Sequence, residues 1–136
     1  MDRLYDAPCD PKQLSPLTLA FVGDGVFDLF VREKLVCTAN CPVNKLHGQA
    51  VRQVNCRAQA AAVQALLPIL TEEEEAVYKR GRNAHTNHVP KNSDPADYHA
   101  ATGFEALFGY LYLKGELERL REFFSILWKE ESFTSG

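Results

Sequence analysis

Residues 19–31 read LAFVGDGVFDLFV, an apolar segment in which Asp24 stands between Gly23 and Gly25. Glycine in a helix interior costs about 1 kcal/mol relative to alanine, and aspartate is a poor helix former. A charge among Phe, Val and Leu side chains is also costly unless something pairs with it. The segment is therefore either a turn or a helix that accepts this cost for a functional reason.

Residues 104–113, FEALFGYLYL, have the same character, because Glu105 is the only charge among them. A helix that is apolar on nearly every face belongs at the centre of a domain. Small residues stand beside the acid in both segments, namely Gly23, Gly25, Gly103, Ala106 and Gly109. Because small side chains allow two helices to approach closely, we expect two central helices that bring Asp24 and Glu105 together.

The rest of the chain predicts further helices, and no segment alternates like a strand between hairpin turns. The first helix begins at Ser15-Pro16 and runs to about Val36. The others are expected from Asn40 or Cys41 to near Pro68, from the capping box Thr71–Glu74 to about Arg80, from Asp94-Pro95 to Gly115, and over 116–131. Residues 72–75, four glutamates, suit a helix N-terminus and are expected to be structural. The sequence thus predicts one all-α domain over 1–136.

The composition is that of a soluble globular protein, with 46% hydrophobic and 24% charged residues and a net charge of −3. No apolar run reaches the 18 or so residues of a membrane span, and the start MDRLYDAPCD does not resemble a signal peptide. Cys37, Cys41 and His47 have neither the spacing nor the fourth ligand of a zinc site. Reduced thiols in a cytoplasmic protein are the expectation.

The two isolated acids point to a metal. Two carboxylates in one apolar site cannot both stay ionised without a cation, because each raises the pKa of the other. Magnesium is commonly held by one or two carboxylates, with water and substrate phosphate at its other positions. Alternatively, each acid pairs with a cation such as Arg32 or His99, and the residues alone leave both interpretations open. Asp28, one turn after Asp24, is expected to form an ion pair along its own helix.

A basic stretch supplies a second indication of function. Residues 81–95 are polar and broken by glycine and proline, which predicts a long loop. Thirteen residues in and before it contain no acid and six basic side chains, Lys79, Arg80, Arg82, His85, His88 and Lys91. Such a cluster in an acidic protein suits contacts to nucleic-acid phosphates, although a solvated loop would have a similar composition.

Two segments carry a resemblance to a known family. LAFVGDGVFDLFVRE, 19–33, resembles the signature helix of the ribonuclease III family, and ATGFEALFGYLYL, 101–113, resembles its second catalytic helix. KRGRNA at 79–84 and PKN at 90–92, with no double-stranded-RNA-binding domain after residue 136, point to the small branch, Mini-ribonuclease III. The resemblance implies a helical nuclease domain that forms a homodimer, with Phe21 packed across the dimer seam.

The same resemblance implies an activity. Asp24 and Glu105 would be catalytic residues that bind Mg²⁺, and each subunit would cut one strand of an RNA duplex, leaving 5′-phosphate and 3′-hydroxyl ends. The implied substrate is a precursor of large-subunit ribosomal RNA. Ala20 and Thr102 stand where longer family members have further acids, which implies weaker magnesium binding completed by RNA phosphate. The rival interpretation is a catalytically silent, RNA-binding or ribosome-associated helical dimer of the same fold.

Overall fold

The computed structural model describes residues 3–38, 42–84 and 89–134, with side chains through Trp128. Within these ranges six α-helices follow one another: α1 (Pro16–Thr38), α2 (Val43–Gln53), α3 (Cys56–Leu66), α4 (Glu72–Arg82), α5 (Pro95–Lys114) and α6 (Leu117–Thr134). In the same ranges, the 3-10 turn η1 (Pro11–Gln13) precedes α1 and the 3-10 turn η2 (Leu67–Ile69) links α3 to α4. The described residues contain no strand, so the prediction of an all-α fold is confirmed. None of these helices is both long and apolar enough to span a membrane.

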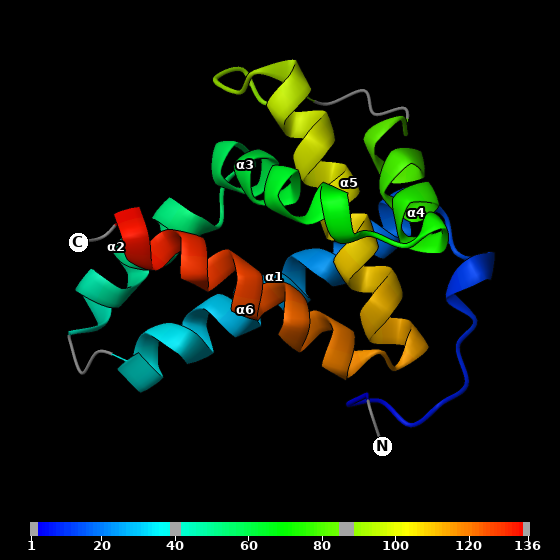
Figure 1. Ribbon diagram of the computed structural model, residues 1–136, viewed down its shortest axis with the longest axis horizontal. Coiled ribbons are helices and arrows are strands. Elements are labelled where there is room, and N and C mark those ends of the chain that lie inside the picture. The colour runs from blue at the N-terminus through cyan, green and yellow to red at the C-terminus, as the bar shows by residue number, and fades with distance from the viewer. Residues whose placement is uncertain (1–2, 39–41, 85–88, 135–136) are drawn as a thin grey trace.

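The helices α1 and α5 cross at the centre of the bundle (Figure 1). Their backbones touch, because a Cβ atom at Gly23 would overlap the carbonyl oxygen of Glu105 and one at Gly109 would overlap that of Leu19. Gly25 differs, since a Cβ atom there would meet nothing within 4 Å. The segment around Asp24 is therefore a helix and not a turn. Of the two glycines that flank Asp24, only Gly23 serves the contact within this chain.

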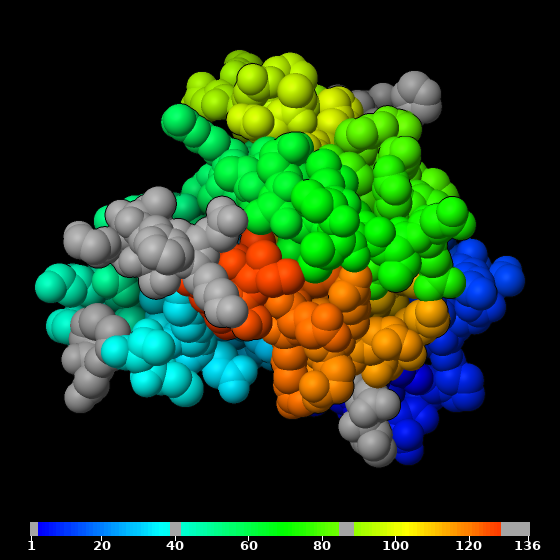
Figure 2. All heavy atoms as spheres, viewed as in Figure 1, coloured from blue at the N-terminus to red at the C-terminus, as the bar shows by residue number. Residues whose placement is uncertain are grey.

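An aromatic cluster fixes α6 against the central pair. The ring of Phe27 lies edge-on to Phe104, with centroids 5.0 Å apart, and stacks on Phe124 of α6 at 5.7 Å. Phe124 also stacks on Phe30 at 4.1 Å and on Trp128 at 4.8 Å. On the face seen in Figure 2, the orange surface of α6 adjoins the green surface of α3 and α4. The central helices are thus covered on this side.

The helix α4 covers another side of α5 and begins with the predicted capping box. Thr71 Oγ1 accepts from the backbone N–H of Glu74, and Glu74 Oε1 accepts from that of Thr71. Glu74 is only 4% exposed and receives two 2.8 Å hydrogen bonds from the Arg119 guanidinium of α6. Burial acts to raise the pKa of Glu74, but Arg119 and the cap hold it below its ordinary value. The structural role expected for this glutamate is confirmed.

The prediction of one continuous helix up to Pro68 is wrong. The helix α2 ends at Gln53 and α3 begins at Cys56, with Asn55 between them in an extended conformation. The Asn55 side chain accepts from the N–H of Ala58 at 2.9 Å and donates to the carbonyls of Val51 and Arg52. Asparagine competes with the helix for backbone hydrogen bonds in this way and so favours caps. The break lets α3 take its own direction across α5.

Candidate active site

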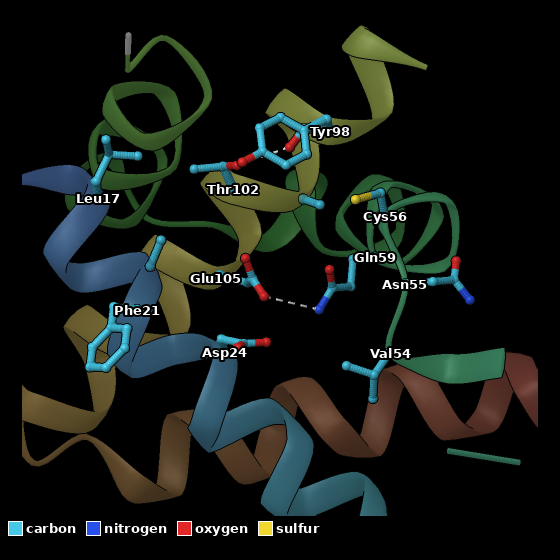
Figure 3. A pocket seen from close by; sticks show the side chains of 12 residues that line it. Leu17, Phe21, Asp24, Val54, Asn55, Cys56, Gln59, Tyr98, Thr102 and Glu105 are labelled. Carbon is cyan, nitrogen blue, oxygen red and sulfur yellow. Dashed lines mark hydrogen bonds between the residues drawn. The ribbon is translucent and has the colours of Figure 1, made fainter. Parts of the chain in front are cut away.

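Asp24 and Glu105 face one cavity of about 400 Å³, as the sequence predicted (Figure 3). Three segments form its walls: the first half of α1, the α2–α3 junction with the first turn of α3, and the first half of α5. The lining residues are Leu17, Ala20, Phe21, Asp24, Val54, Asn55, Cys56, Gln59, Tyr98, Ala101, Thr102 and Glu105. The α1–α5 crossing at Gly23 sets how closely the two acids can approach, because Gly23 precedes Asp24 and contacts the backbone of Glu105.

The two acids have different surroundings in this cavity. Asp24 is exposed at the rim, whereas Glu105 is half-buried. Burial, and next the nearby carboxylate of Asp24, raise the pKa of Glu105 to about 8. The carboxamide of Gln59 acts in the opposite direction, with Nε2 at 3.5 Å from Glu105 Oε2. An ionised Glu105 is therefore costly in this cavity unless a cation accompanies it.

Neither acid forms an ion pair with a basic side chain within the described part of the chain. Arg32, which the sequence left as a possible partner, is bound to Asp28 through a 3.1 Å hydrogen bond from Nε to Oδ2. The ring of His99 instead packs edge-on to Tyr98, with centroids 5.9 Å apart. The alternative of structural ion pairs is thus not found among these residues, and the ion pair expected for Asp28 is confirmed.

The oxygen donors in this cavity fit a hard cation that takes only one or two ligands from the protein. Two carboxylates share the cavity, and no group of three or more His, Cys, Asp or Glu side chains that could hold a metal occurs in the described ranges. Two carboxylates with open positions for water and phosphate are typical of Mg²⁺ sites. The zinc alternative gains no support, because Cys37 is an exposed free thiol and Cys41 lies outside the described residues.

The geometry agrees with comparisons to known proteins. The family profile described as "Ribonuclease III domain" matches residues 17–116, a range that includes both acids and all three walls of the cavity. The chain belongs to the ribonuclease III family.

Relatives of this ribonuclease III chain carry the name of its small branch. It is 53% identical over 113 residues to the Mini-ribonuclease 3 of Symbiobacterium thermophilum, which covers 83% of this chain and 87% of the relative. It is 51% identical over 108 residues to that of a Thermoanaerobacter species, covering 79% and 76%. A crystal structure of a Fusobacterium nucleatum protein superimposes with a TM-score of 0.81 at 28% identity and covers 90% of this chain and 98% of that one. The chain is an endoribonuclease.

Ala20 and Thr102 both line the cavity of this ribonuclease III domain. The resemblance described above implies further acids at these two positions in longer family members. The Thr102 hydroxyl donates to the carbonyl of Tyr98 at 3.0 Å, so it serves the helix and carries no charge. The acidic set of the cavity is therefore reduced to Asp24 and Glu105 within the described chain.

The basic residues lie apart from the acids. Lys79, Arg80 and Arg82 belong to the last turns of α4, which therefore extends two residues into the loop predicted over 81–95. Lys79 pairs with Glu75 at 2.9 Å, and the Arg82 guanidinium lies over the Tyr78 ring at 5.6 Å. Arg80 and Lys91 are exposed, and His85 and His88 lie outside the described residues. Neither Lys79, Arg80, Arg82 nor Lys91 lines the cavity that holds the acids.

A second, polar cavity lies next to the acidic one. Its lining joins the first turn of α3 to the residues that lead into α5, and consists of Asn55, Cys56, Arg57, Asn92, Ser93, Asp94 and Asp97. Asn55 and Cys56 line both cavities, so the two are neighbours. Sequence reasoning missed Asn55, although an asparagine before an alanine-rich helical segment is a recognisable N-cap signal.

Phe21 stands at the mouth of the acidic cavity and is 82% exposed. Leu17, one turn before Phe21, and Leu29, two turns after it, are also exposed on the same side of α1. Gly25 lies on this side too, between Phe21 and Leu29. Residues spaced by four form one face of a helix. This ribonuclease III domain thus leaves an apolar stripe on α1, made of Leu17, Phe21, Gly25 and Leu29, uncovered by the described part of its own chain.

Proposed function

We propose that this endoribonuclease cleaves double-stranded RNA with a magnesium ion held by Asp24 and Glu105. The observation that carries the proposal is the meeting of these two carboxylates in one cavity without a basic partner among the described residues. When bound, Mg²⁺ supplies Lewis-acid chemistry for the attack of water on a phosphodiester, leaving 5′-phosphate and 3′-hydroxyl ends.

The roles of the two acids and of the basic residues follow from their positions. Asp24 at the rim is accessible to the substrate, and the deeper Glu105 gives up its proton when the cation is present. With two carboxylates only, the remaining metal positions belong to water and RNA phosphate, so we infer weak metal binding in the absence of RNA. RNA phosphates contact a basic group consisting of Lys79, Arg80, Arg82, His85 and Lys91.

We further propose that the active form is a homodimer joined through the apolar stripe on α1. A duplex has two strands, and one acid pair cuts one strand at a time, whereas a two-fold dimer places two sites in fixed relation. The exposure of Phe21 supports this assembly. Gly25 supports it too, because it gives a second backbone room to approach and no contact with the described residues requires it. The dimer seam would then border both active sites.

The proposed biological substrate is a precursor of large-subunit ribosomal RNA in the cytoplasm. This part of the proposal rests on the resemblance to the Mini-ribonuclease III branch.

Incubation of the chain with a long RNA duplex and Mg²⁺ tests the proposal, with single-stranded RNA and duplex DNA of the same sequence as matched substrates. We expect cleavage of the RNA duplex alone, loss of cleavage in EDTA, and product ends that a 5′-phosphate-dependent exonuclease degrades. Cleavage that persists in EDTA, or equal cutting of single strands, would refute it.

A further inference from the structure

Gln59 is one of three buried polar or charged side chains in the described chain, with Glu74 and Thr102, and is only 3% exposed. Glu74 is engaged by Arg119, and Thr102 by the carbonyl of Tyr98. Gln59 has its hydrogen bond inside the acidic cavity, to Glu105. A buried amide is costly without a partner, and therefore its position calls for an explanation beyond packing.

The start of α3 places Gln59 in this position. Asn55 caps the helix, and Gln59 follows one turn later, on the side of α3 that faces α5. The Gln59 amide donates from Nε2 to Oε2 of Glu105, which is the direction that an ionised carboxylate requires, because it only accepts hydrogen bonds. Figure 3 shows Gln59 pointing toward Glu105 from the α3 side of the cavity, with Asp24 of α1 close to both. The carboxyl group of Glu105 thus has both a donor, Gln59, and a second carboxylate, Asp24, as neighbours.

We propose that Gln59 is a positioning residue, whose carboxamide holds the Glu105 carboxylate in the orientation that binds the metal ion together with Asp24. This inference rests on the proposed function. An amide suits the task because it donates to a carboxylate without adding charge to a cavity that already holds two acids. Groups that orient metal-binding side chains typically change metal affinity or activity by about 10–100-fold when removed.

The Gln59–Glu105 contact matters more because, among the described residues, the cavity holds only two carboxylates, Asp24 and Glu105. Ala20 and Thr102 add no charge to the cavity, and therefore the cation depends on the orientation of two side chains. At 3.5 Å the hydrogen bond is long, so its own contribution to folding stability is small. A role in metal binding and a role in folding therefore predict different outcomes when the amide is removed.

The test compares Gln59→Met, which keeps the length of the side chain and removes the donor, with Gln64→Met, the same change at an exposed position of α3. Binding of Mn²⁺ to each protein without RNA is followed by the paramagnetic resonance signal of free Mn²⁺. Cleavage of an RNA duplex is then measured over a range of Mg²⁺ concentrations. We expect Gln59→Met to bind Mn²⁺ about 10–100-fold more weakly, and to need correspondingly more Mg²⁺, with unchanged helix content. Gln64→Met should match the wild type.

Gln59→Asn is the second variant, because its amide is one methylene too short to reach Glu105, and it serves the comparison if the methionine variant does not fold. A folded variant at position 59 with wild-type Mn²⁺ affinity and Mg²⁺ dependence overturns the inference while the wild-type activity still supports the proposed function. A wild-type chain that neither binds Mn²⁺ nor cuts the duplex contradicts the proposed function itself.

Discussion

Glu105 carries the strongest electrostatic consequence of the fold. Its single charge lies among apolar residues of a central helix, and the neighbouring acid on α1 adds repulsion to burial. Gln59 offsets only part of this effect. The local sequence indicated that a charge in this apolar helix is costly unless a partner offsets it. Only the packing of α3 on α5 reveals that Gln59 contacts Glu105 in the cavity.

The raised pKa of Glu105 predicts a pH-dependent gain in stability on its replacement. A carboxyl group whose pKa is higher in the folded than in the unfolded chain loses folding stability as pH rises between the two values, here from 4.5 to about 8. In the absence of divalent ions, Glu105→Gln should therefore raise the melting temperature by about 5 °C at pH 8.5 and by little at pH 5. Thermal unfolding followed by circular dichroism checks this, with the exposed Glu33→Gln of α1 as control. An equal effect at both pH values would show that Glu105 is not destabilised by its ionisation.

At the scale of elements, the crossing of α1 and α5 holds the two acids in one cavity. A methyl group at Gly109 would overlap the backbone of Leu19, and neither helix can move without disturbing the Phe27–Phe104 contact. Gly109→Ala should therefore destabilise the fold by about 3 kcal/mol, in the upper range for an overpacked core.

The matched control is Gly48→Ala on α2, where a Cβ atom meets open space. This change should stabilise the fold by up to about 1 kcal/mol, because alanine is the better helix former. Urea unfolding measures both variants. Similar stabilities for the two would contradict the close crossing.

The last turns of α4 and the segment after it carry the electrostatic prediction. Alanine at Arg80, Arg82 and Lys91 should weaken duplex binding and reduce the slope of log K against log[salt] by roughly one for each RNA phosphate that the variant no longer neutralises. The residual activity should keep its metal preference, since none of the three residues lines the acidic cavity. Alanine at Lys12 and Arg121, which lie on η1 and α6, is the control and should leave the slope unchanged. An unchanged slope in the first variant would place the RNA elsewhere.

Local signals predicted some elements well and others poorly. The caps at Thr71 and Asp94 and the left-handed Gly115 gave accurate helix ends, because capping depends on residues close in sequence. The break at Asn55 was missed because the alanine-rich sequence after it favours a continuous helix. Gln59 could not be identified, since its role depends on a contact 46 residues away in sequence.

At the scale of the whole molecule, the apolar stripe on α1 predicts a dimer at micromolar concentration. Phe21→Asp should dissociate it, because a charge would be buried in the seam, and double-strand cutting should be lost. Leu4→Asp, which alters a residue as exposed as Phe21 but outside α1, is the control. Sedimentation velocity measures the assembly of both variants. A wild-type monomer that still makes staggered cuts in both strands would refute the dimer.

Single-turnover cleavage of an RNA duplex in Mg²⁺ by Asp24→Asn and Asp28→Asn tests the role of the acid pair most directly. The two variants make the same change one helical turn apart on α1, but Asp28 is bound to Arg32 and does not line the cavity. We predict that Asp24→Asn abolishes cleavage while its fold and thermal stability are retained, and that Asp28→Asn cuts at close to the wild-type rate. A folded Asp24→Asn variant that still cleaves the duplex as fast as the wild type would contradict the proposed site.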